Sequence, residues 1–308
     1  MKNRFSPWFL VVLVATVCAA TIGIATYLRS RAVERPAERL VQSAHPGAII
    51  LHIDFDALRR AGALNAIAGN RITEEPEYKL FVQQSGFDYR QDLDSVTAAF
   101  YGGETLALAR GRFQWRTLRD YVAAQQGECR NTFCRMVGSQ PNRRISFFPM
   151  RSDIMALAVG NDEWAAARLQ TKRGGPPAFA VPDRPVWLYV PSSVLRQERD
   201  LPAGARLFAQ AMRDSEQVML SLGLVNLGLE ASLEVTCKTP EAAALLLTQL
   251  RGVTALLRDL LAKEGKTANP RDLSGVLVGG NFRAEGRMVR GNWAVPADFL
   301  EALTGGSR

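Results

Sequence analysis

Two cysteines five residues apart are the side chains of this sequence whose type and spacing most directly suggest chemistry. Cys129 and Cys134 bracket four residues in the segment GECRNTFCRMVG. That spacing suits a small closed loop or hairpin end, where a disulfide would constrain the unfolded chain by on the order of 2 kcal/mol. A thioredoxin-type site needs two intervening residues, and zinc needs further ligands nearby. We predict a structural disulfide between Cys129 and Cys134, with two reduced cysteines as the alternative.

His52, Asp54 and Asp56 form the best candidate constellation for a metal ion or for acid–base chemistry. Alternate residues of a strand share one face, so this pattern could present three ligands together. A purely structural interpretation accounts for the same three residues without a bound metal ion. Asp56 caps a helix, Asp54 accepts hydrogen bonds from backbone donors at the strand end, and His52 faces solvent or a polar edge. We therefore predict no metal site and no cofactor.

The other polar motifs predict loops and caps rather than catalysis. Asp88, Asp92 and Asp94 lack the glycine and the terminal glutamate of an EF-hand calcium loop. The paired glycines at 102–103 and 279–280 match no phosphate-binding pattern and are typical of turns. The two histidines lie near the start of the chain, and no Gly-x-Ser-x-Gly elbow is present. We predict no catalytic residue and keep an enzyme as an alternative.

The formal charge of +8 is concentrated at the N-terminus, because residues 1–35 carry half of it. Elsewhere Arg130, Arg135, Arg143 and Arg144 form a local cluster whose one neighbouring stacking aromatic is Phe133. Single-stranded nucleic acids bind to basic grooves interleaved with several aromatic rings. We expect a solvated loop face here and no nucleic-acid partner.

An uncharged stretch, Trp8–Leu28, follows Lys2 and Arg4. As a helix it would extend about 30 Å, the thickness of the hydrocarbon core of a bilayer. A signal peptide cleaved after Ala19 is the alternative, but the chain remains apolar through Leu28, beyond that site. We predict an uncleaved single-pass membrane anchor.

The orientation of this anchor depends on conflicting signals. Four arginines follow the span, and by the positive-inside rule they favour a cytoplasmic C-terminal side. The short basic N-terminus instead resembles the n-region of a signal sequence. A disulfide between Cys129 and Cys134 would require an oxidising compartment. We therefore expect the bulk of the chain to be periplasmic or extracellular.

Two halves of the chain show the same order of predicted elements. A shift of 137 residues lays Asp56–Arg59 over Ser193–Arg196, and in both places an apolar strand, 49–55 or 186–190, leads into a helix. Thr239 and Pro240 predict the start of a long helix in the second half. The first half continues with predicted strands at 94–101, 104–110, 145–150 and 154–160 and predicted helices at 115–126 and 162–169. The second half continues with predicted strands at 217–224, 227–237, 280–284 and 288–294 and predicted helices at 240–262 and 297–303.

These elements predict an α+β fold, in which an N-terminal transmembrane helix precedes two similar halves. Strands that follow one another in pairs favour antiparallel sheets with helices packed on one face. We place the anchor and its flanks at 1–35, the first half at 36–170, a Gly/Pro linker at 171–185 and the second half at 186–308. The linker is expected to be extended and exposed.

Three segments carry a resemblance to a known kind of protein: IDFDALRR at 53–60, the CRNTFC pair followed by RRISFFP, and NFRAEGRMVRGNWAVPADFLEAL at 281–303. The layout resembles uncharacterised bacterial envelope proteins that join an N-terminal anchor to a duplicated α+β domain. That family has no assigned activity, so the resemblance implies an architecture and no residue role.

We expect a single-pass bacterial membrane protein whose exoplasmic, non-enzymatic α+β domain binds or scaffolds another molecule at the envelope. The expected partners are the membrane, through the anchor, and a protein or a small apolar ligand. One alternative is an envelope enzyme with a site between the two halves. The other is a carrier of an apolar ligand, which would need a long apolar cleft.

Overall fold

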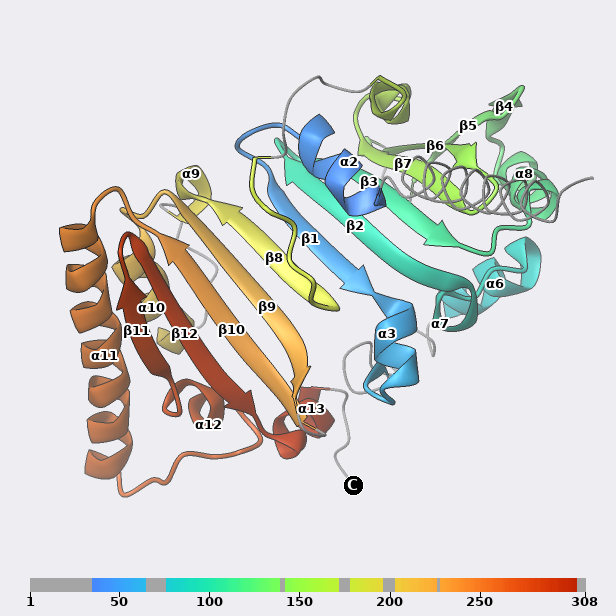
Figure 1. Ribbon diagram of the computed structural model, residues 1–308. Coiled ribbons are helices and arrows are strands. Elements are labelled where there is room, and N and C mark those ends of the chain that lie inside the picture. Colours follow the sequence, from blue (N-terminus) through green and yellow to red (C-terminus); the bar gives the residue numbers. More distant parts are fainter. Residues whose placement is uncertain are drawn as a thin grey trace, which may run out of the picture.

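The computed structural model describes residues 35–64, 76–138, 142–171, 178–195, 203–225 and 228–303, and it has an α+β fold (Figure 1). Its strands form one antiparallel sheet of 12 strands in the order β11-β12-β10-β9-β8-β1-β2-β3-β7-β6-β5-β4. The first half supplies β1 (Ile49–Asp54), β2 (Leu93–Tyr101), β3 (Glu104–Gly111), β4 (Glu128–Arg130), β5 (Phe133–Val137), β6 (Arg144–Arg151) and β7 (Ile154–Gly160). The second half supplies β8 (Val186–Pro191), β9 (Gln217–Val225), β10 (Gly228–Thr236), β11 (Asn281–Glu285) and β12 (Met288–Val295). The predicted α+β class is confirmed.

The two halves meet in the middle of this sheet, where β1 and β8 pair antiparallel. Moving outward from that pair, the strands run β1-β2-β3-β7-β6 on one side and β8-β9-β10-β12-β11 on the other. The third strand of each series is followed by a helix, α8 (Trp115–Ala124) or α11 (Pro240–Lys263). The last two strands of each half, β6 and β7 or β11 and β12, then return to the sheet, the later one beside the third strand. The order of these five strands is the same in both halves, and the first half has the additional strands β4 and β5 between α8 and β6.

Several helices begin where a side chain accepts a hydrogen bond from a free backbone N–H group. The Asp54 carboxylate accepts from the backbone N–H of Ala57 at 2.7 Å and caps α3 (Phe55–Arg60). The prediction that Asp56 is this cap was wrong by two residues, because the chain turns helical directly after Asp54. At α11 the Thr239 hydroxyl accepts from the N–H of Ala242 at 3.2 Å, as the sequence predicts.

Helices cover both faces of the sheet in the first half. We call the face bearing Ile50 and Trp187 face A, and the opposite face, which bears Ile53, face B. On face A, α2 (Pro36–Ser43) and the 3₁₀ helix η1 (Ala165–Leu169) enclose a core with β1, β2, β3 and β7. On face B, α3 and α8 pack over β2, β3, β5, β6 and β7. The expected one-sided arrangement was wrong here because strands such as β7, IMALAVG, are apolar on both faces.

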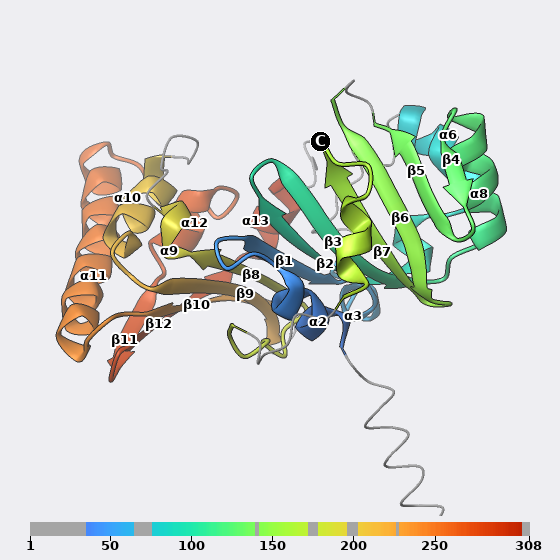
Figure 2. The same cartoon turned by 90° about the horizontal axis from the view of Figure 1, so that it is seen from above.

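The hydrophobic core of the outer strands of the second half lies on face B. The core contains α10 (Ala203–Met212), α11 and α12 (Leu273–Leu277), packed on β9, β10, β11 and β12. Figure 2 shows these helices on one side of the sheet and α2 on the other. The remaining helices are α6 (Pro76–Ser85), α7 (Tyr89–Asp92), α9 (Ser192–Leu195) and α13 (Ala297–Leu303). Face A of these outer strands is polar.

We expected the segment between the halves to be exposed, and the burial of Phe179 contradicts this. Residues 178–185 form neither helix nor strand, as predicted, but Phe179 is buried and its ring stacks on Tyr189 at 4.3 Å between centroids. The carbonyl of Pro185 accepts a hydrogen bond from the N–H of Asp54. These contacts fix residues 178–185 along face A.

The predicted anchor, Trp8–Leu28, lies outside the described residues. Within the described ranges, none of the helices combines the length and the apolar character that a membrane span requires.

Candidate functional site

The predicted disulfide is present and structural. Cys129 and Cys134 face each other directly across β4 and β5, with an S–S distance of 2.02 Å and a Cα–Cα distance of 4.0 Å. Cys134 is buried in the face-B core of the first half. Cys237 is a buried free thiol in the core of the second half, and burial raises its pKa. Among the described cysteines, none combines an exposed thiol with a lowered pKa, so thiol chemistry has no support here.

We predicted that His52 faces solvent or a polar edge, and the structure shows it half-buried and packed against Trp187. Its ring stacks on Trp187 at 5.2 Å between centroids, and its Nδ1 lies 2.8 Å from the hydroxyl of Thr97. Burial lowers the pKa of His52 to about 4, against an opposing attraction from Asp54. At neutral pH the ring is therefore neutral and hydrogen-bonded within face A.

The pattern His-x-Asp-x-Asp does not form a ligand cluster. Asp54 is committed to the cap of α3, and Asp56 forms ion pairs with Arg59 and Arg60, both at 3.3 Å. Nowhere in the described part of the chain do three histidine, cysteine or carboxylate side chains gather as metal ligands.

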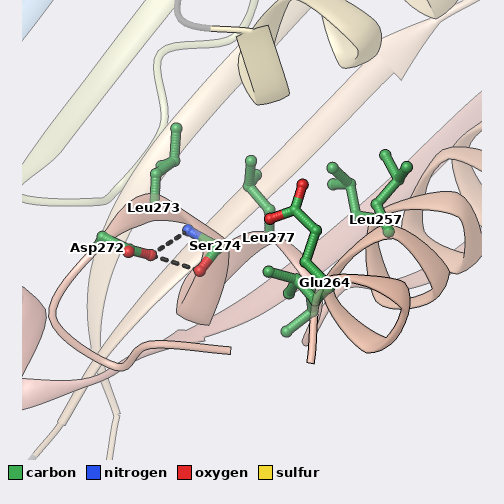
Figure 3. A pocket seen from close by; sticks show the side chains of 9 residues that line it. Leu257, Glu264, Asp272, Leu273, Ser274 and Leu277 are labelled. Atoms are coloured by element: carbon green, nitrogen blue, oxygen red, sulfur yellow. Dashed lines mark hydrogen bonds between the residues drawn. The ribbon is translucent and has the colours of Figure 1, made fainter. Parts of the chain in front are cut away.

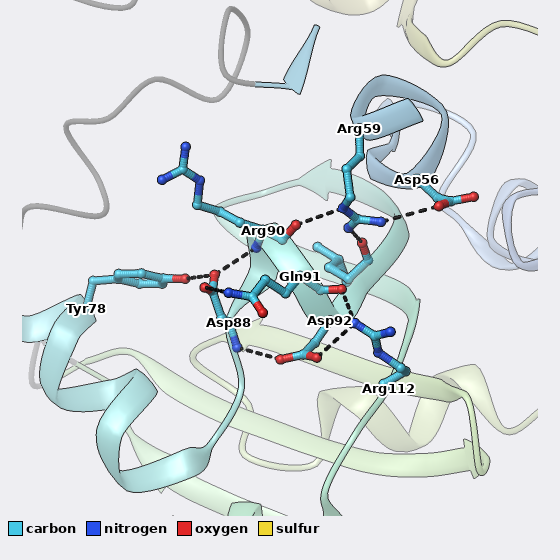
Figure 4. Close-up of polar contacts among 9 residues, drawn as sticks. Asp56, Arg59, Tyr78, Asp88, Arg90, Gln91, Asp92 and Arg112 are labelled. Carbon is cyan, nitrogen blue, oxygen red and sulfur yellow. Dashed lines mark hydrogen bonds and ion pairs between the residues drawn. The ribbon is translucent and has the colours of Figure 1, made fainter. Parts of the chain in front are cut away.

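The acidic segment around α7 is also structural (Figure 4). Asp88 caps α7 through the N–H of Arg90 and accepts a hydrogen bond from the hydroxyl of Tyr78 at 2.8 Å. Asp92 accepts from the N–H of Asp88 and pairs with Arg112 at 3.3 Å. Burial and the hydrogen bond to Asp88 raise the pKa of Tyr78. These two carboxylates accept hydrogen bonds from backbone, tyrosine and arginine donors.

Intramolecular pairs neutralise part of the arginine cluster. Arg135 contacts Glu163 and lies 2.6 Å from Glu128, which also pairs with Arg130. Its guanidinium also lies 4.6 Å above the ring of Trp164. These contacts pair Arg130 and Arg135 with carboxylates and place Arg135 on an aromatic ring.

A polar hollow of about 580 Å³ lies on face A of the second half, between residues 180–184 and the strands β9 to β12. We call it the face-A hollow. Directly opposite residues of antiparallel strands share a face, and the pairs Ser221–Ser232 and Glu234–Arg290 point to this side. Its polar lining includes Ser221, Ser232, Glu234, Arg283, Arg290 and Asn292.

The charges of the face-A hollow are paired but exposed. Arg290 lies 3.2 Å from Glu234 and also contacts Glu285, and Arg283 lies 3.3 Å from Glu285. The Arg290 and Glu234 side chains are 33% and 49% exposed. Exposed ion pairs stabilise a fold by at most about 1 kcal/mol each, so a partner can exchange them at little cost. Both signs of charge are present.

Arg184 closes one side of the hollow. It lies over Gly223, where an added Cβ would come within 1.6 Å of the guanidinium, so only glycine admits this approach. The same guanidinium is 3.9 Å from Glu230. Arg184 therefore holds residues 178–185 against β9 and β10.

A second, apolar crevice lies between α11 and α12 (Figure 3). It encloses about 330 Å³, and its apolar lining is Leu257, Leu260, Leu261, Leu273, Leu277 and Val278. Two carboxylates, Glu264 and Asp272, stand at its rim. Hydrogen bonds from Lys266 and Ser274, respectively, lower the pKa values of these carboxylates. An anionic ligand would meet this negative rim.

The face-A hollow was not predicted from the sequence. The alternation in β10, GLEASLEVT, puts Glu230, Ser232 and Glu234 on one face and is a signal of an open polar side. The partner strand that supplies Arg290 lies 56 residues later. Only the strand pairing brings these residues together.

No known family model matches the sequence, and no curated protein matches it. Among solved structures, crystal form I of TP0453 aligns with a TM-score of 0.49 and 12% identity, over 88% of this chain and 99% of that one. Crystal form IV of TP0453 has a TM-score of 0.47 and 11% identity, over 89% and 98% of the respective chains. At these values the similarity carries no conclusion about fold or function.

Proposed function

We propose that the chain is a membrane-tethered, non-enzymatic binding or scaffolding protein of the bacterial envelope. Its α+β domain would lie on the exoplasmic side and bind a polar segment of another protein in the face-A hollow. The observation that carries the binding role is this uncovered, charged face beside a first half whose sheet is covered on both sides.

The disulfide supports the exoplasmic location. Such bonds persist in oxidising compartments and are rare in the cytoplasm. The bond between Cys129 and Cys134 joins two short strands at the edge of the sheet. The uncharged stretch Trp8–Leu28 supports the tether, since it has the length of a membrane span.

The chemistry of the hollow supports a polypeptide partner. Arg184, Arg283 and Arg290 are accompanied by carboxylates, so the site has no excess charge that would select a nucleic acid. Serine and asparagine side chains add neutral donors and acceptors. A polar chain carrying both charge signs can replace the existing ion pairs one for one.

The shared strand order supports a duplicated origin of the two halves. Outward from the β1–β8 pair, both series of five strands have the same order, with β4 and β5 added in the first half. In this proposal the first half gained β4, β5 and the face-A helices, and the second half kept face A open.

Counting accessible thiols tests the location. The chain has four cysteines, so denatured but unreduced protein from intact cells should take up two maleimide groups, on Cys18 and Cys237. Prior reduction should raise the number to four. Four additions without reduction would contradict an exoplasmic domain.

Photo-crosslinking in cells tests the binding role. A photoreactive residue at Ser232, inside the hollow, should give a defined protein adduct, whereas one at the exposed turn residue Ser152 should not. Arg290→Glu, which places a third acidic group beside Glu234 and Glu285, should abolish the Ser232 adduct while the tryptophan fluorescence of the fold is unchanged. Adducts of equal yield from both positions, or an adduct that survives Arg290→Glu, would contradict binding in the hollow.

The apolar crevice between α11 and α12 favours a second candidate, a carrier of a small apolar ligand. Its volume lies near the lower end for small-molecule sites. A neutral fluorescent probe should then bind and be displaced by neutral alkyl ligands, and Leu277→Gln should weaken it. Unchanged probe binding in Leu277→Gln would remove this candidate.

A further inference from the structure

The crevice between α11 and α12 combines apolar walls with an acidic rim (Figure 3). The fold covers its apolar side chains only in part: Leu260 is 44% exposed, and the other lining leucines and Val278 are half-buried. The crevice encloses about 330 Å³. A ligand with a short hydrocarbon chain would occupy this space and remove those side chains from water, which is favourable.

Glu264 lies at the end of α11 where a carboxylate is electrostatically unfavourable. It is the C-cap of this helix of 24 residues, so the negative end of the helix dipole lies at the rim of the crevice. A cation is favoured at such a helix end, and Glu264 adds a second source of negative potential there. The Lys266 ammonium lies 2.7 Å from Glu264, and these side chains are 68% and 58% exposed. Because an exposed pair contributes little to stability, a cationic ligand can replace Lys266 at small cost.

Asp272 supplies a second carboxylate from the start of α12. It accepts hydrogen bonds from the backbone N–H and from the hydroxyl of Ser274, and both bonds end on Oδ1. The cap of α12 therefore leaves Oδ2 for another donor. Among the nine residues that line the crevice, the charged side chains are those of Glu264 and Asp272. The nearby Arg258 is held outside this lining, where its Nε donates to the carbonyl of Val278 at 3.0 Å.

We propose that this crevice binds a small amphiphilic amine. Its hydrocarbon part lies among the leucines, and its ammonium group lies at the acidic rim formed by Glu264 and Asp272. Charge selects this occupant, because an ammonium group donates strong hydrogen bonds to carboxylate oxygens and is attracted to the end of α11. A ligand with a carboxylate or phosphate head group would be repelled at the same rim. This inference rests on the carrier candidate described above and names the class of its ligand.

A matched ligand series tests the head group. Phenylbutylamine, phenylbutanol and phenylbutanoate share one hydrocarbon part and are cationic, neutral and anionic at neutral pH. Each is titrated against a neutral fluorescent probe bound to full-length protein in phosphatidylcholine nanodiscs, with empty nanodiscs as the blank. The amine should bind about fivefold more tightly than the alcohol, and the acid more weakly than the alcohol. High salt should narrow both differences.

Substitutions that remove one charge each test the rim. Glu264→Gln and Asp272→Asn should each reduce the preference for the amine over the alcohol about twofold, and the double variant should bring the two ligands to equal affinity. Asparagine still caps a helix, so α12 keeps its start in Asp272→Asn. Glu241→Gln is the matched control, because Glu241 is exposed in the first turn of α11, at the opposite end of the same helix. It should leave all three affinities unchanged.

The outcomes separate this inference from the carrier candidate. Equal affinities of the wild type for the amine and the alcohol would overturn the inference and leave the carrier candidate standing. Failure of all three ligands to displace the probe would overturn both. A preference for the amine that survives in the double variant, or that is lost equally in Glu241→Gln, would overturn the role of Glu264 and Asp272.

Discussion

Acidification should destabilise this fold through one half-buried histidine. His52 lies between Trp187 and Thr97, and burial lowers its pKa from 6.5 to about 4 in the folded chain. Above about pH 6.5 the ring is neutral in the folded and in the unfolded chain. Between that pH and about pH 4 the unfolded chain binds a proton that the folded chain does not, so the free energy of unfolding falls as the pH falls.

The loss of stability can be calculated from the shift in the pKa of His52. Each unit of pKa difference corresponds to 1.36 kcal/mol, so His52 accounts for a loss of about 3 kcal/mol by pH 4. Below that pH both states carry the proton and the loss from this residue ends. Domains are stable by about 5–15 kcal/mol, so one histidine removes a substantial share.

Urea unfolding followed by tryptophan fluorescence, at steps between about pH 7 and pH 4, measures the effect. His52→Gln is the reference, because glutamine keeps a polar group near Thr97 and does not titrate. Subtracting the two curves removes the contributions of the carboxylates that both proteins share. The wild-type stability should fall by about 3 kcal/mol more than that of the variant.

Parallel stability curves for wild type and His52→Gln would refute this reasoning. So would a nuclear magnetic resonance titration in which the folded His52 ring protonates near its ordinary value of 6.5. The chain has two histidines, so a His45→Gln variant assigns the signal without ambiguity.

Three further predictions concern the framework of the fold. Replacing Cys129 and Cys134 by serine should lower the free energy of unfolding by about 2 kcal/mol in urea titrations, because a short closed loop is released in the unfolded chain. Gly111→Ala should cost about 1–3 kcal/mol, since its Cβ would come within 2.3 Å of the backbone carbonyl oxygen of Asp92; an unchanged melting temperature would contradict this. Thr239→Ala should cost about 1 kcal/mol through the lost cap of α11, and Thr239→Ser should restore it.

Local signals in the sequence predicted many of the elements. Thr239 and Pro240 mark the start of α11, and the apolar run after Ile49 that ends in aspartates marks the transition from β1 to α3. Cys129 and Cys134 were predicted as a disulfide from their spacing alone. In each case the residues that decide the structure lie within a few positions of one another.

Features that depend on distant pairing were missed. Asp54 and Asp56 are both good caps, and the choice between them depends on where β1 leaves the sheet. The burial of His52 depends on Trp187, which lies 135 residues later and is placed beside it by the β1–β8 pair. The face-A hollow likewise needs Arg290 opposite Glu234.

The position of β1 at the centre of the sheet sets the order in which the protein can be completed during synthesis. One edge of β1 pairs with β2, its neighbour in the first half, but the other edge waits for β8. Ile53 and Val186 are partners 133 residues apart, which corresponds to roughly 7–27 s of translation at 5–20 residues per second. During that interval an apolar strand edge is open to other chains. A nascent first half therefore exposes this strand edge until β8 has been made.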